Sequence, residues 1–437
     1  MVASAGAPDI RVRDKRRVPR LDGIRGVCAV LVVVTHVAFS TIVLSSDFGS
    51  PPEGFWSILA AGQVGAIGPF FVLSGMLLYR PFARAAIIGT PKPALVPFFI
   101  RRGARLLPAF WLLVVFCLVV LNHSILDGVW SVLRPFVLLH YYDSAYYAGL
   151  DVTWTVPTET QFYLALPLLA WLMARLARGV DDPVQKVRRM MLPLGGLVVA
   201  QFAWTGYIHS QLDPWPPQFF YPFSISGLFA IGMAFALWSV LAEVSPNRPP
   251  ALFRAAARRP NLFWLGALAA YGIQVLQPFS TPGTADWLTP QAALVRHVLL
   301  LSFSFFVMVP LVVPQVRSRL IEGVLGNPVA RYLGRISYGI YLWHFAMMYL
   351  VFESGSIFGE PPVPVGFLLG QFGFWELMIP TLLGTVVLAS LSFYLVERPV
   401  IRLGERVIRS GWAPSPAVAS AGSQLLPAAG PPPERQP

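Results

Sequence analysis

Residues 24–44 read IRGVCAVLVVVTHVAFSTIVL, and this stretch decides the class of fold. All of its residues except Arg25 and His36 are apolar or small. The hydrocarbon core of a bilayer is about 30 Å thick, and a helix needs roughly 20 apolar residues to cross it. We therefore expect a transmembrane helix here. The run is too long for a signal peptide and lacks a small-residue cleavage site, so we expect the helix to be retained.

Nine further segments have the same character, in a chain of 437 residues that is 55% hydrophobic and only 12% charged. Soluble domains carry about twice that share of charge. The sequence therefore predicts an all-α polytopic membrane protein with about ten transmembrane helices. The expected spans are 24–44, 62–80, 105–121, 158–176, 191–209, 222–242, 262–278, 293–314, 335–352 and 376–396. A weaker stretch at 129–140 is expected to lie at the membrane interface.

The positive charges indicate how these spans alternate across the membrane. With the N-terminus placed in the cytoplasm, the inner segments hold 31 of the 33 Lys and Arg residues, and the outer ones hold only Arg134 and Arg296. Membrane proteins concentrate Lys and Arg on their cytoplasmic side. Both termini are therefore expected in the cytoplasm, with the protein in the inner or plasma membrane. The net charge of +12 then belongs to a membrane surface and not to a nucleic-acid partner.

Three regions are expected along the chain: a basic cytoplasmic arm at 1–20, a transmembrane domain at 21–405, and a disordered cytoplasmic tail at 406–437 that is rich in Pro and Ala. No soluble catalytic domain is expected, so any chemistry must use the membrane domain. The two cysteines, Cys28 and Cys117, lie in apolar runs, which supports neither a disulfide framework nor a metal cluster. We expect no metal and no permanently bound cofactor.

Two ionisable residues inside the first span are the leading candidates for chemistry, because charged groups in a membrane are costly to bury. Arg25 and His36 are eleven residues apart, which is close to three helical turns, so they share one face. His36 then lies about 18 Å deep, near the bilayer centre. An imidazole at that depth is suited to proton transfer. The alternative is a neutral histidine that packs against a neighbouring helix, but Arg25 on the same face favours function.

A second intramembrane histidine, His344, is expected at a depth similar to that of His36. One interpretation is that two histidines at one level line a common cavity. The alternative for His344 is a structural polar contact between helices, which we consider slightly the better interpretation.

Glu159 begins the span at 158–176, close to Trp154 and Tyr163. Together these residues suit a surface that faces a sugar. The alternative is structural: Thr158 would cap the helix, and an acidic residue in the first turn would be favoured by the helix dipole.

Three arginines, Arg101, Arg102 and Arg105, open the third span at its inner end. Positive charge is expected on that side in any case, but three guanidinium groups within five residues are also suited to bidentate phosphate contacts. In the second span, Ser74 and Gly75 form a small polar break at mid-depth, which either contributes to a site or allows close helix packing. Aromatic residues gather in the outer connection at 122–157, as an interfacial belt or as a platform for sugar rings.

Taken together these stretches resemble the membrane-bound acyltransferase-3 family. The matching motifs occur in the family's order: Leu21 to Gly26 with His36, Phe70 to Gly75, Arg101 with Arg102, Arg105 and Pro108, Trp154 to Tyr163, Ser337 to His344, and Val396 to Pro399. The resemblance spans about residues 20–405. The chain departs from the family pattern at Thr155, Pro157 and Thr158, just before Glu159.

The resemblance implies transfer of an acyl group, acetyl above all, from cytosolic acyl-coenzyme A to a hydroxyl of an envelope glycan or glycolipid. It implies that His36 is the general base or a transient acyl carrier. Arg25 would position the donor or an anionic intermediate, and Glu159 would orient the acceptor or assist proton transfer. The donor's phosphates would be held by Arg101, Arg102 and Arg105. The substrate would be contacted by Trp154, Tyr163, His344 and Ser74.

Two other functions remain open at this point. A proton-coupled transporter or lipid translocase would use the same buried His and Arg as a relay, and would consume no acyl donor. A scaffold for envelope assembly would not need its intramembrane charges. A lipid-linked glycosyltransferase is disfavoured, because no outer pair of acidic residues and no metal-ligand cluster is present in the sequence.

Overall fold

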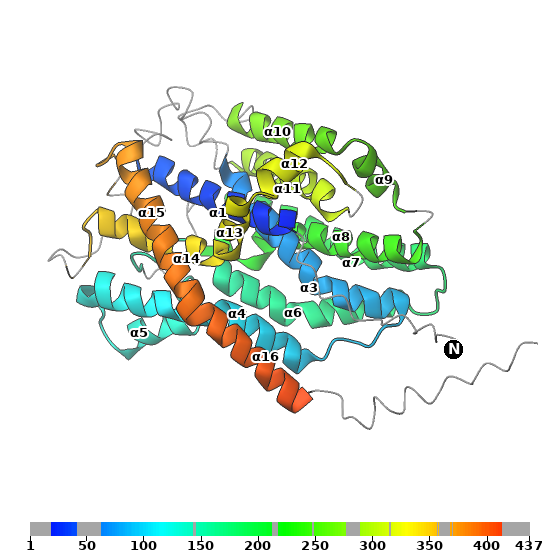
Figure 1. Ribbon diagram of the computed structural model, residues 1–437, viewed down its shortest axis with the longest axis horizontal. Coiled ribbons are helices and arrows are strands. Elements are labelled where there is room, and N and C mark those ends of the chain that lie inside the picture. The colour runs from blue at the N-terminus through cyan, green and yellow to red at the C-terminus, as the bar shows by residue number, and fades with distance from the viewer. Residues whose placement is uncertain are drawn as a thin grey trace, which may run out of the picture.

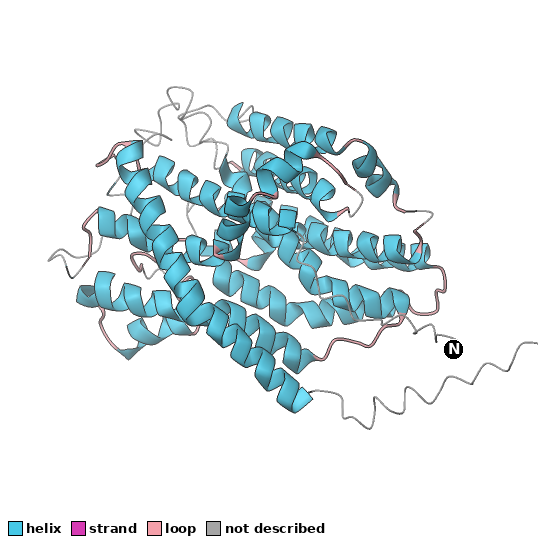
Figure 2. Ribbon diagram, in the orientation of Figure 1, coloured by secondary structure: helices cyan, strands magenta, loops and turns pink. Residues whose placement is uncertain are grey.

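The computed structural model describes residues 19–41, 63–142, 146–211, 217–246, 249–276, 289–313, 316–355, 357, 368 and 370–412. These residues form helices joined by short connections, as Figure 2 shows. The longer helices are α1 (Pro19–Ser40), α3 (Gly68–Ile88), α4 (Leu95–Phe116), α6 (Thr155–Leu176), α7 (Pro183–His209), α8 (Ser226–Val244), α10 (Pro260–Leu276), α11 (Pro290–Val312), α14 (Ser337–Val351), α15 (Phe374–Ser392) and α16 (Arg398–Trp412). The prediction of an all-α polytopic membrane protein is confirmed.

Shorter elements connect or extend these helices. Four are α-helices: α5 (Val129–Phe136), α9 (Ala251–Arg258), α12 (Arg319–Leu325) and α13 (Pro328–Arg335). Four are single 3₁₀ turns: η1 (Gln63–Ile67), η3 (His123–Ile125), η4 (Pro217–Phe220) and η5 (Pro222–Ile225). Two are π-helical turns that continue a longer helix: η2 (Cys117–Leu121) and η9 (Phe393–Glu397).

Each of the ten expected spans overlaps a helix of the structure, and residues 42–44, 62, 277, 278 and 314 of these spans lie outside the described part of the chain. Seven described helical stretches are long and apolar enough to cross a membrane: Pro19–Ser40, Gly65–Ile88, Leu95–Leu121, Pro183–His209, Pro222–Val244, Pro290–Val312 and Phe374–Gly411. Of the other three, α10 has 17 residues and α14 has 15. The third, α6, has 22 residues, but its first seven, Thr155 to Gln161, make nearly two turns that are rich in polar side chains. All three pack among the long helices (Figure 1).

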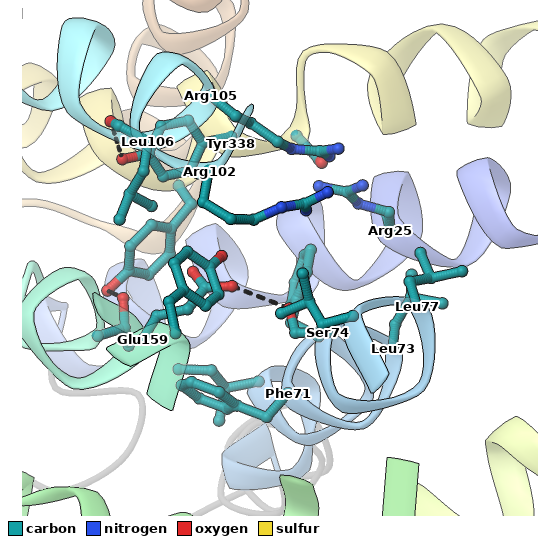
Figure 3. Close-up of a pocket in the computed structure, with 17 residues that line it drawn as sticks. Arg25, Phe71, Leu73, Ser74, Leu77, Arg102, Arg105, Leu106, Glu159 and Tyr338 are labelled. Carbon is teal, nitrogen blue, oxygen red and sulfur yellow. Dashed lines mark hydrogen bonds between the residues drawn. The ribbon is translucent and has the colours of Figure 1, made fainter. Parts of the chain in front are cut away.

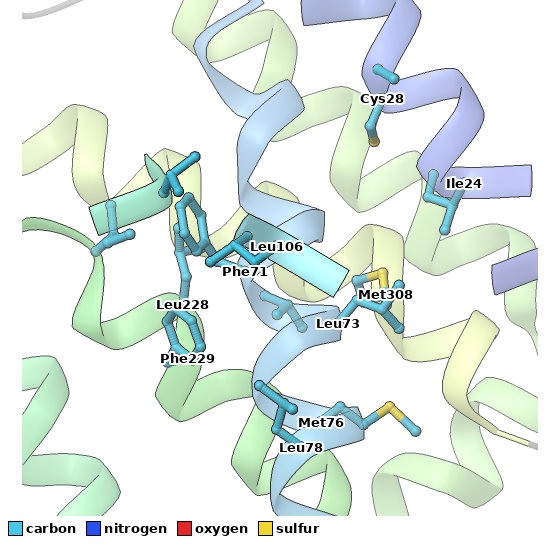
Figure 4. Packing of buried hydrophobic residues seen from close by; sticks show 14 of the residues in the cluster. Ile24, Cys28, Phe71, Leu73, Met76, Leu78, Leu106, Leu228, Phe229 and Met308 are labelled. Carbon is cyan, nitrogen blue, oxygen red and sulfur yellow. The ribbon is translucent and has the colours of Figure 1, made fainter. Parts of the chain in front are cut away.

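Close helix packing builds the centre of the bundle, where α3 crosses α8 and where α1 lies against α13 and α14. Figure 4 shows Phe71 of α3 near Phe229 of α8, and the centroids of these two rings lie 5.6 Å apart. Glycine permits this approach, since a Cβ on Gly75 would lie 2.5 Å from the Phe229 carbonyl oxygen. Gly75, in the small polar break of the second span, thus allows close packing of α3 against α8.

We expect Gly232→Ala to lower the thermal stability of the protein. A Cβ on Gly232 of α8 would lie 2.0 Å from the Val72 carbonyl oxygen of α3, and a backbone oxygen cannot move aside as a flexible side chain can. Overpacking of this kind costs about 1–3 kcal/mol or more. Thermal unfolding in detergent measures the effect. Gly195→Ala in α7 is the matched control, because its Cβ would meet nothing within 4 Å. Equal unfolding temperatures for the two variants would contradict the packing account.

Contacts between distant segments support the expected alternation of the connections. Arg80 and Arg84 near the end of α3 both pair with Glu243 at the end of α8. Arg101 at the start of α4 pairs with Glu405 of α16, with 3.0 Å between Nε and Oε1. All of these segments were expected on the inner side, and the structure brings them to one end of the bundle. We call this end the arginine-rich face.

Several features of this face differ from the sequence-based expectation. Arg20 was assigned to the N-terminal arm, but it is buried at the start of α1 and donates hydrogen bonds to the Val313 and Val316 carbonyl oxygens. The expected connections around 245–261 and 315–335 contain α9, α12 and α13. The last long helix continues through η9 into α16 and ends at Trp412, beyond the expected start of the tail at 406. Residues 1–18 and 413–437 lie outside the described part of the chain.

Candidate active site

Five helices enclose a cavity of about 110 Å³ in the middle of the bundle (Figure 3). Its walls come from α1, η1 with α3, α4, α6 and α14. The polar side chains that line it are Arg25, Ser74, Arg102, Arg105, Thr155, Glu159, Tyr163, Ser337, Tyr338 and Tyr341. Apolar residues of η1, α3 and α4, among them Phe71 and Leu106, complete the wall. Candidate residues that are far apart in the sequence therefore meet around one space.

Three guanidinium groups face a single carboxylate in this cavity. Arg102 and Arg105 lie one turn apart on α4, and α1 brings Arg25 towards them (Figure 3). The Nε atoms of Arg25 and Arg102 are buried without a hydrogen-bond partner among the described residues. Buried donors that lack a partner are costly. The surplus of positive charge and the unsatisfied donors together make the cavity suited to an anionic group of a ligand.

Glu159 supplies the negative charge of the cavity. Its Oε1 atom accepts a hydrogen bond from Ser74 Oγ at 2.9 Å, which joins α6 to α3. The structural alternative for this residue is wrong, because α6 begins at Thr155 and not at Thr158. Thr158 caps nothing; its hydroxyl is buried and donates to the Phe220 carbonyl oxygen at 2.8 Å. Glu159 therefore projects into the cavity from beyond the first turn.

Tyr338 and Tyr341 of α14 form the wall opposite α3. The Tyr338 hydroxyl donates to the Leu106 carbonyl oxygen at 2.8 Å. The Tyr341 hydroxyl accepts from Thr155 Oγ1 at 2.8 Å and donates to the Val152 carbonyl oxygen. These contacts fix both rings, so α14 presents a rigid aromatic surface to the cavity.

His36 and His344 contact each other directly, as the similar depth predicted from the sequence allows. His36 Nδ1 lies 2.9 Å from His344 Nε2, and the two rings stack with their centroids 5.0 Å apart. Neither histidine is among the residues that line the cavity. The link to it is Tyr341, since His344 Nδ1 lies 2.7 Å from the Tyr341 carbonyl oxygen.

The hydrogen bonds assign a tautomer to each neutral ring. A carbonyl oxygen only accepts, so His344 Nδ1 must carry hydrogen and donate to Tyr341. His344 Nε2 is then an acceptor, and His36 Nδ1 donates to it. His36 Nε2 is left with a lone pair. The contact with His344 thus fixes the orientation of the His36 ring.

The comparisons with known proteins identify the group to which this arrangement belongs. A family model described as an acyltransferase domain matches residues 18–397, which include the whole cavity and both histidines. The chain belongs to the acyltransferase-3 family. No solved structure matches the chain.

Curated relatives within the acyltransferase-3 family are distant in sequence. The chain is 25% identical over 418 residues to a Bacillus subtilis protein named "Putative peptidoglycan O-acetyltransferase YrhL", covering 91% of this chain and 57% of that one. It is 23% identical to "Putative O-acetyltransferase SACOL0978" of Staphylococcus aureus, covering 93% and 60%. It is 24% identical to "Nodulation protein 10" of Rhizobium leguminosarum, covering 85% and 92%. The chain thus spans less than two thirds of the length of the first two.

Not all of the predicted site residues of this family member meet at the cavity. Arg101 points away from it and pairs with Glu405 on the protein surface. Trp154 lies just outside, where its ring stacks on Phe71 at a centroid distance of 6.3 Å and meets Phe220 in a tilted arrangement at 5.2 Å. The structure therefore separates Arg101 from the neighbouring Arg102, a distinction that the run of arginines does not reveal.

Glu397 is a residue near the site whose position the sequence did not predict. The Pro399 that follows two residues later indicates a helix end, but the helix continues and Glu397 is 4% exposed. The π-helical turn η9 turns its carboxylate towards Arg25 and Arg105, with which it interacts electrostatically. Ser392 Oγ donates to Glu397 Oε1 at 3.3 Å. π-Helical turns inside α-helices often mark functional sites. Here the turn brings a second carboxylate, which does not line the cavity, close to Arg25 and Arg105.

A second polar cluster lies in the connection between α5 and α6, at the end opposite the arginine-rich face. Asp151 accepts from the Gly149 amide at 2.9 Å and from the Tyr349 hydroxyl at 3.3 Å. The Tyr349 and Tyr146 hydroxyls are hydrogen-bonded to each other. Burial raises the pKa of the Asp151 carboxyl to about 7. The aromatic residues of this connection thus contribute to its internal packing.

We expect Asp151 to make stability depend on pH. Its folded pKa lies above the ordinary value near 3.9, so the folded state binds the proton more tightly. Stability should therefore fall as the pH rises from about 4 towards 7 and then level off. Asp151→Asn should unfold at a temperature that rises relative to wild type between pH 5 and pH 8. The unfolding temperatures of wild type and variant, recorded from pH 5 to pH 8, measure this difference. Asp127→Asn replaces an exposed aspartate between η3 and α5 and should follow wild type. Parallel curves for all three proteins would contradict the assignment.

Proposed function

We propose that the protein is an O-acyltransferase of the plasma membrane that moves an acyl group, above all acetyl, from acyl-coenzyme A to a hydroxyl of an envelope glycan or glycolipid. The observation that carries the proposal is the connected arrangement of an arginine-lined cavity and an oriented histidine base in one bundle. Membership of the acyltransferase-3 family supports acyl transfer. The name of the Bacillus relative supports acetyl as the transferred group and an envelope glycan as the acceptor.

The donor enters from the arginine-rich face, which the charge distribution assigns to the cytoplasm. Its phosphates bind Arg25, Arg102 and Arg105, whose guanidinium groups suit phosphate oxygens. Eleven residues of helix separate Arg25 from His36, which corresponds to about 16 Å. A donor with its anionic end at Arg25 and a long flexible arm therefore places its thioester at the level of the histidines.

The chemical step uses His36 as a general base, with His344 holding its tautomer. His36 Nε2 removes the proton from the acceptor hydroxyl while the hydroxyl oxygen attacks the thioester carbonyl carbon. The new C–O bond forms, the C–S bond breaks, and the leaving thiolate takes the proton back from His36. Base catalysis by a positioned histidine typically contributes 10²–10⁴-fold to the rate.

Glu159 and Ser74 orient the ligand within the cavity. Tyr341 lies at the end of the cavity towards the acceptor side, where its hydroxyl is hydrogen-bonded to Thr155 and to the Val152 carbonyl oxygen, and Trp154 packs against Phe71 just outside the cavity. Tyr163 lies about two turns further along α6, near Arg102. Glu159 lies among arginines, so its carboxylate also offsets part of their positive charge when no ligand is bound. The acceptor reaches His36 from the end where the connection between α5 and α6 lies.

Transfer of label from radiolabelled acetyl-coenzyme A tests this function. Membranes with the wild-type protein are incubated with extracted envelope lipids and glycans, and membranes with a stably folded His36→Ala protein serve as the control. Label in an envelope fraction with wild type alone supports the proposal. Absence of transfer from acetyl-coenzyme A and longer acyl donors, with the protein folded in the membrane, would refute it and favour a proton-coupled transporter.

A further inference from the structure

A second concave site lies on the arginine-rich face, away from the cavity. α9, α10 and α11 form a groove of about 520 Å³ that is lined by Ala255, Arg258, Arg259, Leu262, Phe263 and Phe306. In Figure 1, α9 lies at the upper right of the bundle, next to the right-hand end of α10. None of the groove residues lines the candidate active site.

The groove changes from charged to apolar along its length. Arg258 ends α9, and Arg259 follows in the link to α10; both side chains are exposed. Neither arginine forms an ion pair with any residue that the structure describes. One turn further along α10, Phe263 packs against Phe306 of α11 with their ring centroids 6.3 Å apart. A ligand in the groove therefore meets two guanidinium groups at one end and apolar side chains at the other.

Residues next to the groove add positive charge at its edge. Asn261 accepts a hydrogen bond from Ser318 Oγ at 2.9 Å, which joins the start of α10 to the start of α12. Ser318 lies between two exposed arginines, Arg317 and Arg319. The nearest acidic residue of α12, Glu322, interacts electrostatically with Arg20. Four arginines thus gather at this corner of the bundle.

The apolar end of the groove continues on the outer surface of α10. Gly266 approaches the Phe306 ring, with 3.2 Å between an ideal Cβ and the ring, so α10 and α11 close the groove there. Leu262, Leu265 and Leu268 form an exposed stripe along α10, at 53%, 58% and 64% exposure. In a transmembrane helix such a stripe faces lipid, so an acyl chain can follow it from the groove into the bilayer.

We propose that this groove binds an anionic phospholipid of the leaflet at the arginine-rich face. Arg258 and Arg259 hold the phosphate by bidentate hydrogen bonds, and one acyl chain lies over Phe263 and along the α10 stripe. An arginine pair at the membrane surface attracts anionic lipid in any case. The concave wall and the adjoining apolar stripe add selectivity for a molecule that has both a phosphate and an acyl chain.

Native mass spectrometry of the purified, delipidated full-length protein tests the site, with phosphatidylglycerol and phosphatidylcholine as probes. We expect wild type to bind phosphatidylglycerol about tenfold more tightly, and the double variant Arg258→Ala/Arg259→Ala to lose most of that preference. Arg188→Ala/Arg189→Ala is the matched control, because this pair in α7 is also exposed and adjacent but lines none of the described cavities. It should bind like wild type.

Three results would overturn the proposal. The first is equal binding of the two lipids by wild type. The second is a preference that survives in Arg258→Ala/Arg259→Ala, or that is lost equally in the control pair. The third is displacement of phosphatidylglycerol by glycerol phosphate at the same concentration as by the lipid itself, because the groove would then bind a free phosphate. Thermal unfolding of each variant confirms that the protein tested is folded.

Discussion

Replacing His36 by alanine is expected to lower the rate of acyl transfer by at least about a hundredfold, with the protein still folded in the membrane. The variant removes the nitrogen that accepts the acceptor's proton, and general base catalysis contributes about 10²–10⁴-fold. The effect should fall on kcat, because the imidazole does not hold the donor's phosphates. Initial rates with radiolabelled acetyl-coenzyme A over a range of donor concentrations measure kcat and KM separately.

The control for this variant is His123→Ala, which removes an exposed histidine in the connection after α4. It should keep the wild-type rate. His344→Asn should lower kcat less than His36→Ala does, because it disturbs the orientation of His36 without removing the base. A kcat within about twofold of wild type in a folded His36→Ala protein would contradict the role of His36.

The second large effect is expected from Arg102→Ala. Hydrogen bonds to charged groups contribute about 1.5–3 kcal/mol. Loss of the phosphate contacts should therefore lower kcat/KM for the donor by about 10- to 100-fold, mainly through KM. The loss should shrink at high ionic strength, where the wild-type contacts are themselves screened. Kinetics at two salt concentrations measure both effects.

The neighbouring Arg101 provides the matched control. Its guanidinium group pairs with Glu405 outside the cavity, and exposed ion pairs contribute little to stability. Arg101→Ala should therefore keep kcat/KM within about twofold of wild type. If the two variants lose activity equally, the arginines act through the overall charge of the face and not through the cavity.

The fold was predictable from the sequence because apolar runs in a membrane protein map onto helices. The run at 24–44 and the nine others each overlap a helix, since a bilayer leaves no other way to satisfy the backbone of a single segment. The short helices α9, α12 and α13 were not predicted. They have only seven or eight residues each, so none gives an apolar run long enough to stand out, although the capping residues Ser318 and Asn327 are present in the sequence.

The site was predictable as a set of residue types but not as an arrangement. Intramembrane Arg25, His36 and His344 stood out because ionisable groups are rare in apolar helices. Which of these residues meet in the folded protein could not be predicted. Arg25 lines the cavity, whereas the two histidines form a pair on the far side of Tyr341. Spacing along one helix places residues on a face, but only the packing of α1 against α14 decides what that face contacts.

Glu397 shows a further limit of inference from sequence. The Glu-Arg-Pro order at 397–399 indicates the end of a helix, because proline removes a backbone donor. The π-helical turn η9 accommodates the proline and lets the helix continue. The same turn directs the carboxylate inward. A local rule about helix ends therefore fails where the chain uses an irregular turn to place a charged group.

The central claim is that the cavity between α1, α3, α4, α6 and α14 holds the acyl donor. Photolabelling with a coenzyme A thioester that carries a photoreactive acyl group tests it most directly, with the labelled peptides identified by mass spectrometry. The account predicts label in peptides that include Ser74, Tyr163 or Tyr341, and its loss with excess unlabelled coenzyme A or in Arg102→Ala. Label confined to peptides outside these helices, or label that excess coenzyme A does not displace, would contradict it.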